Sequence, residues 1–153
     1  MPNMVANRVF FGGYDKQMEF INKLKPKGSE EEFSFEWLIP TPKDCEDPTD
    51  WHWKNWGTKW DVCNLFVGIE CLEFDTPWNE PEGIYRKMAE MFPDMDFTAY
   101  YLYDDESHMG YYDHVGGMKG LEDYEEDNYT DEWDQMLKDI WGLYGDEEDN
   151  YTE

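Results

Sequence analysis

The sequence predicts an α+β sandwich of the ferredoxin-like type, an antiparallel sheet with helices on one face, followed by an acidic amphipathic helix. Two observations support this class. Segments with strand and helix patterns follow one another in the order β-α-β-β-α-β. The 153-residue chain is also 18% Phe, Trp and Tyr, which is enough aromatic surface for a packed core, and its length predicts one compact domain.

The chain begins with one strand and one helix. Residues 5–11 are rich in strand-forming side chains and stop at a pair of glycines. Apolar side chains then recur at helical spacing over residues 14–25, and Pro26 ends that helix. The first β-α unit is therefore expected between residues 5 and 25.

A second strand and a long tryptophan-rich loop are expected next. Phe33, Phe35 and Trp37 alternate with polar residues, which is the period-two pattern of a half-buried strand. A loop is expected over residues 40–61, and loops this long are uncommon unless they have a function. Four of the eight tryptophans lie in it: Trp51, Trp53, Trp56 and Trp60.

The next segments are expected to complete the sheet. The patterns predict a third strand over residues 68–74 and a fourth over residues 97–103. Between them, apolar side chains at helical spacing predict a helix over residues 84–92, which a proline stops. Residues 109–115 are expected to return as a hairpin partner of the fourth strand, which adds one strand to the basic set.

The charge of the chain is strongly negative and unevenly distributed. Thirty-seven acidic side chains against twelve basic ones give a net charge of −25, which excludes unassisted binding to a nucleic-acid backbone or an anionic membrane. Fourteen acidic side chains and one lysine give residues 121–153 a net charge of −13, and residues 1–120 carry the other −12. We therefore divide the chain into a ferredoxin-like domain, residues 1–120, and an acidic extension, residues 121–153.

The acidic extension contains a predicted helix. Trp133 and Trp141 belong to an apolar stripe at helical spacing, which predicts an amphipathic helix over about residues 131–144. Such a stripe packs on another surface, most simply that of its own domain. The hexapeptide Glu-Glu-Asp-Asn-Tyr-Thr flanks the helix at residues 125–130 and 147–152, either as a duplicated solvated segment or as two copies of one contact element.

Three segments together resemble a known family. They are Met1-Pro2-Asn3 with Asn7-Arg8-Val9, the run Asn55-Trp56-Gly57-Thr58-Lys59-Trp60-Asp61, and Phe74-Asp75-Thr76-Pro77-Trp78 with Met91-Phe92-Pro93. Over about residues 1–120 the chain resembles the YubB-like ferredoxin-like domain proteins of plasmids, phages and other mobile elements. Met4 and Pro77 depart from the pattern, which has an aromatic residue and Ala or Ser there. The resemblance implies a ferredoxin-like fold and a mobile-element origin, and it implies no catalytic residues.

Patterns for catalysis, metals and cofactors are weak. The carboxylates and histidines within residues 104–114 lack the spacing of known metal motifs, which favours a polar hairpin turn. Cys63 and His52 would be the nucleophile and base of a catalytic pair, but nothing near them in sequence favours an activated thiol. We expect no catalytic residue, no metal and no cofactor.

The tryptophan-rich region allows an alternative function, the binding or sequestering of a small nucleotide-type ligand. Aromatic rings near Lys54 and Lys59 are suited to stacking on a base. Packing of the loop on the sheet is the favoured interpretation, because two lysines make a weak positive groove in so acidic a protein. The alternative pocket would consist of Trp53, Trp56, Trp60 and Trp78.

The acidic surface gives the leading functional hypothesis. Carboxylates fixed on a scaffold imitate phosphates and occupy the basic groove of a nucleic-acid-binding protein. As one helix the extension would span at most ~50 Å, or one charge per ~3.8 Å, close to the ~3.4 Å spacing along one DNA strand. We expect a non-enzymatic inhibitor, encoded by a phage or mobile element, of a host defence protein such as a CRISPR effector, a restriction enzyme or another nuclease.

The expected contacts lie in the acidic extension. The partner-binding carboxylates would be Glu122, Asp123, Glu125, Glu126, Asp127, Asp131, Glu132, Asp134, Glu147, Glu148 and Asp149. Rigid anchors would be Tyr124, Tyr129 and Tyr151. The partner would be a basic nucleic-acid-binding protein of a bacterial host. The lack of a signal-peptide pattern and the odd number of cysteines favour the cytoplasm. A third interpretation is an acidic accessory protein whose charge serves solubility.

Overall fold

The structure is an α+β fold built on one antiparallel sheet. The computed structural model of the chain describes residues 3–121 and 131–143. Its elements are β1 (Met4–Phe10), α1 (Tyr14–Leu24), the 3-10 turn η1 (Phe35–Trp37), α2 (Pro48–Asn55), β2 (Cys63–Val67), β3 (Leu72–Pro77), α3 (Glu82–Met91), β4 (Thr98–Tyr103), β5 (Met109–Asp113), β6 (Gly117–Gly120) and α4 (Asp131–Asp139). None of the described helices is long and apolar enough to span a membrane.

The sheet topology confirms the predicted fold class. The six strands lie in the order β2-β3-β1-β4-β5-β6, and each neighbouring pair is antiparallel. Because β1 pairs with both β3 and β4, the two β-α-β halves of the chain interleave, as the ferredoxin-like sandwich requires. The hairpin of β5 and β6 then extends the sheet beyond β4, so the structure has one strand more than the sequence patterns predict.

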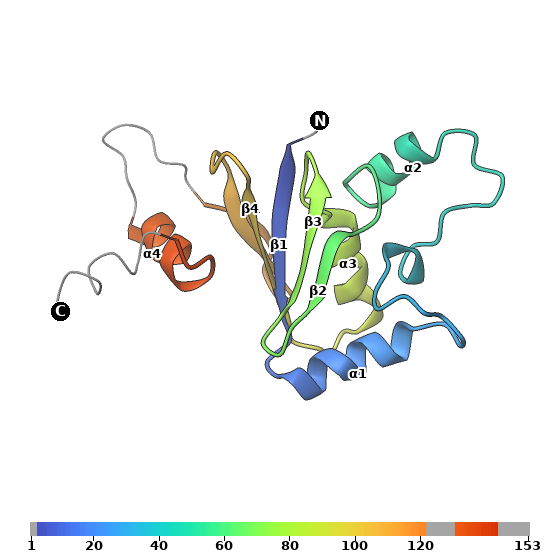
Figure 1. Cartoon of the computed structure of the whole chain (residues 1–153), viewed down its shortest axis with the longest axis horizontal. Helices are drawn as coiled ribbons and strands as arrows, with labels where there is room; N and C mark the ends of the chain where they lie inside the picture. The colour runs from blue at the N-terminus through green and yellow to red at the C-terminus, as the bar shows by residue number, and fades with distance from the viewer. Residues whose placement is uncertain (1–2, 122–130, 144–153) are drawn as a thin grey trace.

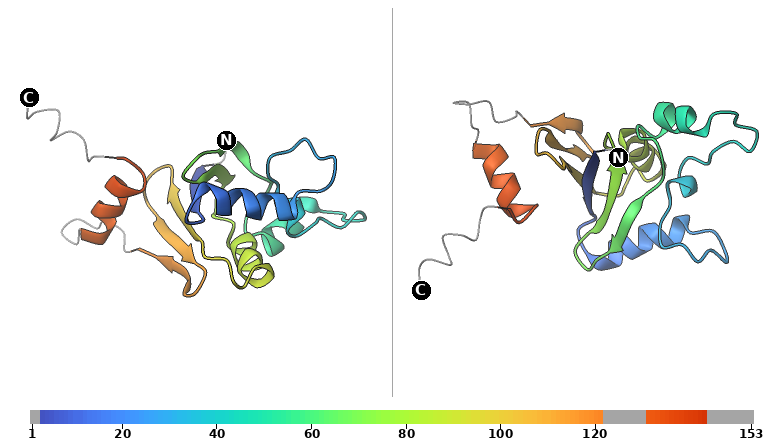
Figure 2. Two further views of the ribbon diagram at one scale, coloured as in Figure 1. Left: turned by 90° about the horizontal axis from the view of Figure 1, so that it is seen from below. Right: turned by 45° about the horizontal axis from the view of Figure 1, so that its top comes forward.

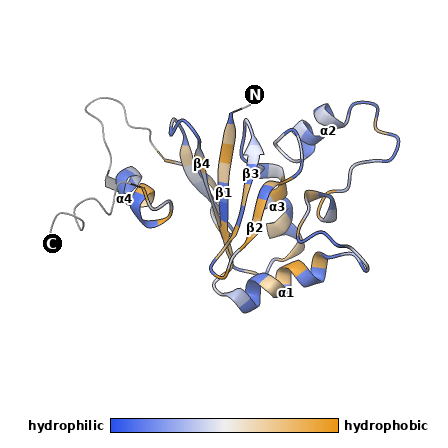
Figure 3. Ribbon diagram, in the orientation of Figure 1, coloured by the Kyte–Doolittle hydropathy of each residue, from blue (hydrophilic) through white to orange (hydrophobic). Residues whose placement is uncertain are grey.

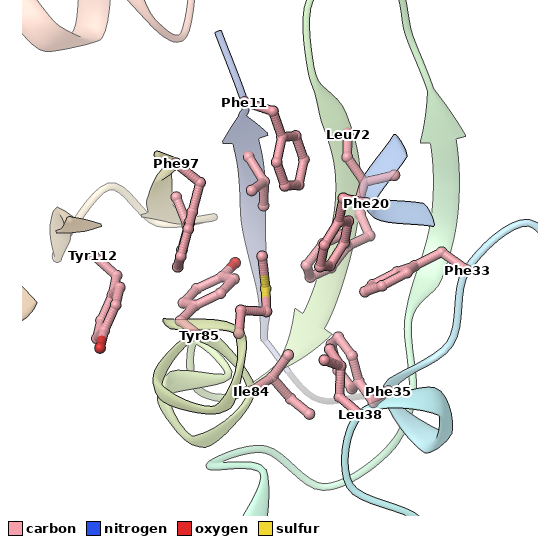
Figure 4. Packing of buried hydrophobic residues seen from close by; sticks show 14 of the residues in the cluster. Phe11, Phe20, Phe33, Phe35, Leu38, Leu72, Ile84, Tyr85, Phe97 and Tyr112 are labelled. Atoms are coloured by element: carbon pink, nitrogen blue, oxygen red, sulfur yellow. The ribbon is translucent and has the colours of Figure 1, made fainter. Parts of the chain in front are cut away.

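The first face of the sheet is covered by α1 and α3, and the aromatic core lies between them (Figures 1 and 4). Alternate residues of β1 point into this layer, so Val5, Asn7 and Val9 are buried. At the end of β1, Phe11 stacks on Phe20 of α1 with ring centres 4.9 Å apart. Figure 3 shows hydrophobic residues on the central strands and hydrophilic ones along the chain before α2.

A buried polar network joins three elements within this core. The Asn7 side-chain amide donates to the Thr76 hydroxyl at 3.0 Å, and the Asn7 side-chain oxygen accepts from the Tyr85 hydroxyl at 2.7 Å. Burial raises the pKa of Tyr85 well above its ordinary value, so its hydroxyl stays a donor. Since buried polar groups need partners, the network fixes α3 over β1 and β3.

The predicted second strand at Phe33–Trp37 is wrong. The segment forms η1 instead, and Phe33, Ser34 and Phe35 are all buried rather than alternating between two faces. The carboxylate of Asp61 accepts hydrogen bonds from the Ser34 hydroxyl and, at 2.8 Å, from the Phe35 backbone N–H. These contacts fold the segment into a turn over the core, and β2 takes the position beside β3.

The third strand also differs from its prediction over residues 68–74. β3 begins at Leu72, and residues 68–71 form the turn that follows β2. The sequence pattern does not reveal β2, because its register shifts between Cys63 and Phe66 and it pairs on one side only, at the edge of the sheet. The predicted fold class is correct, although the predicted bounds of the third strand are not.

The expected loop over residues 40–61 contains a helix, α2. Its N-cap is Asp47, whose side chain accepts from the Asp50 backbone N–H at 3.1 Å, and Pro48 occupies the first turn. An acidic cap followed by proline is a common helix start, so the sequence does carry the signal for α2.

The fourth helix, α4, lies on the opposite face of the sheet from α1 and α3 (Figures 1 and 2). Trp133, Leu137 and Trp141 are buried there in one cluster with Leu102 of β4 and Met109 of β5. The helix ends at residue 139, earlier than the predicted 144. The molecule therefore has three layers, and the acidic extension contributes the third.

Candidate functional site

A single row of side chains crosses the α4 side of the sheet from edge to edge. It has one residue from each strand, in sheet order Phe66, Glu73, Arg8, Tyr100, Tyr111 and Lys119. The Arg8 Nε lies 2.9 Å from the Glu73 carboxylate, and the Lys119 Nζ lies 5.9 Å from the centre of the Tyr111 ring. Each cation of this cross-sheet row is therefore next to a carboxylate or an aromatic face.

The fourth helix runs along the cross-sheet row and covers four strands. At its start, Glu132 lies 3.7 Å from Lys119 of β6. Beyond its end, Arg8 of β1 donates to the Ile140 carbonyl and lies 5.0 Å from the Trp141 ring centre. From Glu132 to Trp141 the chain advances nine residues, which is about 14 Å at the helical rise of ~1.5 Å per residue. This length equals about three spacings between neighbouring strands. α4 therefore spans from β6 to β1 and leaves β3 and β2 uncovered.

A hollow of about 370 Å³ remains beside the end of α4. We call it the β3 groove, and it is lined by Ala6, Asn7, Arg8, Asn64, Phe66, Glu73, Phe74, Asp75 and Trp141. Phe66 stands at one side with 60% of its surface exposed, and Trp141 stands at the other. Two carboxylates, Glu73 and Asp75, belong to β3 between them, so the groove combines negative charge with aromatic walls.

The polar groups of the β3 groove are only partly engaged. One oxygen of Asp75 accepts from the Asn64 side-chain amide at 2.9 Å, and its other oxygen has no hydrogen-bond partner among the described residues. The indole N–H of Trp141 is buried and likewise lacks an acceptor within the described part of the chain. The Glu73 carboxylate, in contrast, accepts a hydrogen bond from the Arg8 side chain.

Comparison with known families establishes what the chain is related to. Residues 55–143 match the family described as "Ferredoxin-like domain in Api92-like protein". The chain belongs to this family. The match runs from the end of α2 through α4, so this Api92-like domain includes the acidic helix and five of the six described strands. Neither a curated protein nor a solved structure gives a match.

Most of the predicted partner-binding residues of this Api92-like chain lie outside the described residues. These are Glu122, Asp123, Glu125, Glu126, Asp127, Glu147, Glu148 and Asp149, the anchors Tyr124, Tyr129 and Tyr151, and the side chain of Asp131. Glu132 and Asp134 are described, both on α4. Glu132 is exposed and pairs with Lys119, and Asp134 lies 3.2 Å from Lys138.

The tryptophans of the alternative ligand pocket have different environments. Trp56 is fully buried, and its indole N–H donates to the Ile39 carbonyl at 2.9 Å, so its ring belongs to the core. Trp53, Trp60 and Trp78 are exposed at 44%, 40% and 40%. None of the four lines the β3 groove or the second hollow, which lies beside α1. Because its ring is fully buried, Trp56 offers no surface to a ligand in this structure, and a pocket formed by Trp53, Trp60 and Trp78 stays a prediction.

The run from Asn55 to Asp61, where the family match begins, is explained by packing. The buried Thr58 hydroxyl donates to the Pro77 carbonyl at 2.8 Å. Gly83 of α3 approaches α2 so closely that a Cβ there would lie 2.1 Å from the Asn55 carbonyl oxygen. The run thus joins α2 to α3 and to the end of β3.

His52 and Cys63, the residues of the possible catalytic pair, are engaged in structural contacts. His52 stacks on Trp56 with ring centres 3.8 Å apart, and the Cys63 sulfur accepts from the Trp60 indole at 3.0 Å, so His52 and Cys63 are held by other neighbours. Burial raises the pKa of the Cys71 thiol to about 11, which keeps it protonated near neutral pH. Within the described residues, no three His, Cys, Asp or Glu side chains are grouped to hold a metal ion.

Proposed function

We propose that this protein is a non-enzymatic inhibitor that binds a basic, nucleic-acid-binding protein through an acidic surface organised by α4. The docking of α4 is the observation that carries the proposal. Trp133, Leu137 and Trp141 bury the apolar stripe of the acidic extension on the sheet, and Arg8 binds the carbonyl that follows α4. Mimicry of nucleic acid depends on carboxylates held in fixed positions, because ordering a free segment costs affinity.

The electrostatics favour a partner of opposite charge. The chain has a net charge of −25, and α4 contains four acidic residues, Asp131, Glu132, Asp134 and Asp139, against one lysine, Lys138. A basic groove would be attracted over a range set by the Debye length, about 8 Å at physiological salt. Association would therefore be fast at low salt and would slow as salt is added.

The kind of partner follows from the resemblance to mobile-element proteins. A phage or plasmid that enters a bacterium meets host proteins that recognise nucleic acid through basic grooves. We include in the proposal that the partner is such a defence protein, a CRISPR effector, a restriction enzyme or another nuclease, and that the inhibitor acts in the host cytoplasm. The inhibitor blocks the groove and needs no chemistry of its own.

The test compares two variants of equal net charge. The first replaces five carboxylates before α4 by amides: Glu122→Gln, Asp123→Asn, Glu125→Gln, Glu126→Gln and Asp127→Asn. The control replaces five exposed carboxylates between α1 and α2: Glu30→Gln, Glu31→Gln, Glu32→Gln, Asp44→Asn and Glu46→Gln. Both variants have the same charge, so only the position of the lost carboxylates differs.

The measurement is capture from a bacterial lysate on each immobilised protein, with elution by duplex DNA and then by salt. We expect the wild type and the control to retain basic nucleic-acid-binding proteins that DNA displaces, and the first variant to bind them at least about tenfold more weakly. Equal loss in both variants, or capture that salt does not reverse, would contradict mimicry by the extension.

A further inference from the structure

We propose that the β3 groove binds an arginine side chain of the basic partner. This inference rests on the proposed function and adds the chemical group that is recognised. Asp75 would bind the guanidinium group, Phe66 and Trp141 would contact its faces, and the groove of about 370 Å³ has room for one such side chain.

The chain's own Arg8 shows how an arginine is held on this surface. Its guanidinium group meets a carboxylate (Glu73, 2.9 Å), a backbone carbonyl (Ile140) and an aromatic ring (Trp141, 5.0 Å to the ring centre). The β3 groove offers two of these three kinds of group next to this site, a carboxylate and aromatic rings. It has the carboxylate of Asp75, the wall of Trp141 and the exposed ring of Phe66 at the edge strand.

Two unengaged groups in the groove match the needs of an arginine-bearing segment. The second oxygen of Asp75, which has no partner among the described residues, is free to complete a two-pronged contact with a guanidinium group. Trp141 is 93% buried and its indole N–H lacks an acceptor in the described part of the chain, so a backbone carbonyl of the bound segment would satisfy it after a small side-chain shift.

Other occupants fit the groove less well. The carboxylates Glu73 and Asp75 outnumber the one cation that lines the groove, Arg8, which disfavours a phosphate or a nucleotide. A second copy of this chain would bring another net charge of −25. Addition of a partner strand to β2 is disfavoured, because the register shift in β2 and the left-handed backbone of Asn64 (φ 51°) interrupt its edge. Arginine is favoured over lysine because its planar group both stacks on rings and binds a carboxylate with two N–H groups.

The test uses hexa-arginine and hexa-lysine peptides with the full-length protein. Nuclear magnetic resonance follows the indole N–H signal of Trp141 and the backbone amides of Phe66 and Asp75 during each titration. We expect hexa-arginine to shift these signals and to bind about threefold or more tightly than hexa-lysine. Asp75→Asn and Phe66→Ala should each weaken the arginine peptide about fivefold. Glu31→Gln, which removes the same charge from an exposed position away from the groove, should change affinity less than about twofold.

Four outcomes would overturn the inference. Equal affinities for the two peptides would indicate a general electrostatic attraction to the acidic protein, without a role for the β3 groove. Equal weakening by Asp75→Asn and Glu31→Gln would indicate the same. Shifts confined to residues outside the groove would do the same. A failure of both peptides to bind at about 0.05 M salt, where screening is weak, would contradict the proposed function as well. Unchanged thermal midpoints of the variants would verify that they are folded, as the partial exposure of Phe66 and Asp75 leads us to expect.

Discussion

The two faces of the sheet are built from the same strands but differ in their side chains and in how far helices cover them. The face under α1 and α3 is filled by aromatic and aliphatic side chains, and its central polar group, Asn7, is bonded to Tyr85. The α4 side instead combines charges and rings, as in Glu73, Arg8 and Tyr100, and is covered over four of six strands. The first face specifies the fold, whereas the second leaves charge and aromatic surface in fixed positions, where we propose that a partner binds.

The largest expected effect comes from the closed face, which is the face of the sheet under α1 and α3. Trp56→Ala should lower the free energy of unfolding by about 3–5 kcal/mol, because it leaves a large cavity in the core and an unbonded carbonyl at Ile39. Urea denaturation followed by circular dichroism measures this change. The matched control is Trp53→Ala, three residues earlier in α2, where the ring is 44% exposed and its loss should cost less than about 1 kcal/mol. Similar losses in the two variants would show that Trp56 does not anchor α2.

A smaller effect is expected where α2 and α3 touch. Gly83→Ala would place a methyl group against the Asn55 carbonyl, so the helices must separate at a cost of about 2–3 kcal/mol. The control is Gly116→Ala, at a turn where an added Cβ meets nothing within 4 Å. Thermal denaturation of the two variants gives the comparison. A Gly83→Ala protein as stable as the control would mean that α2 and α3 are farther apart at Gly83 than the structure shows.

On the open face, which α4 covers in part, we expect a substitution to lower stability locally rather than globally. Trp141→Ala removes the contact with Arg8 and part of the apolar stripe, so we expect a loss of about 1–2 kcal/mol, confined to α4. Hydrogen exchange should quicken at the amides of α4 and stay unchanged at those of β1 and α3. If exchange quickened equally in all three elements, α4 would be part of the central cooperative unit and the two faces would not differ in this way.

The elements that the sequence predicts well are those with local periodicity. The first strand, α1, α3 and the stripe of α4 each carry their pattern within a dozen residues. The turn at Phe35 does not, because the group that shapes it, Asp61, lies 26 residues later in the chain. α2 carries a usable signal in Asp47-Pro48, which the high density of tryptophans obscures.

The candidate site is less predictable than the fold. Phe66, Glu73 and Arg8 become neighbours through the register of three strands, and their spacing along the chain gives no sign of it. The sequence predicts an acidic helix that docks, but it does not indicate which strands the helix covers. β6, which no pattern reveals, supplies the Lys119 that pairs with the start of α4.

The smallest expected effect concerns the titration of tyrosines on the closed face. Burial, together with the neighbouring carboxylate of Glu80, raises the pKa of Tyr101 and of Tyr103, and the Tyr103 hydroxyl donates to Glu80 at 3.0 Å. Because folding favours the neutral form of both, their contribution to stability is full below the ordinary tyrosine pKa of about 10 and declines as pH rises above it. The free energy of unfolding should therefore fall with pH in the alkaline range.

Glu80→Gln isolates the part of this effect that is due to charge. The amide keeps an acceptor for the Tyr103 hydroxyl but removes the negative charge, so Tyr103 should ionise at lower pH than in the wild type. Tyrosinate absorbance in the ultraviolet measures the ionisation, and urea denaturation at several alkaline pH values measures the stability. An unchanged titration in Glu80→Gln would mean that burial alone holds these tyrosines neutral. The alkaline loss of stability would then be due to the burial of these tyrosines and not to the charge of Glu80.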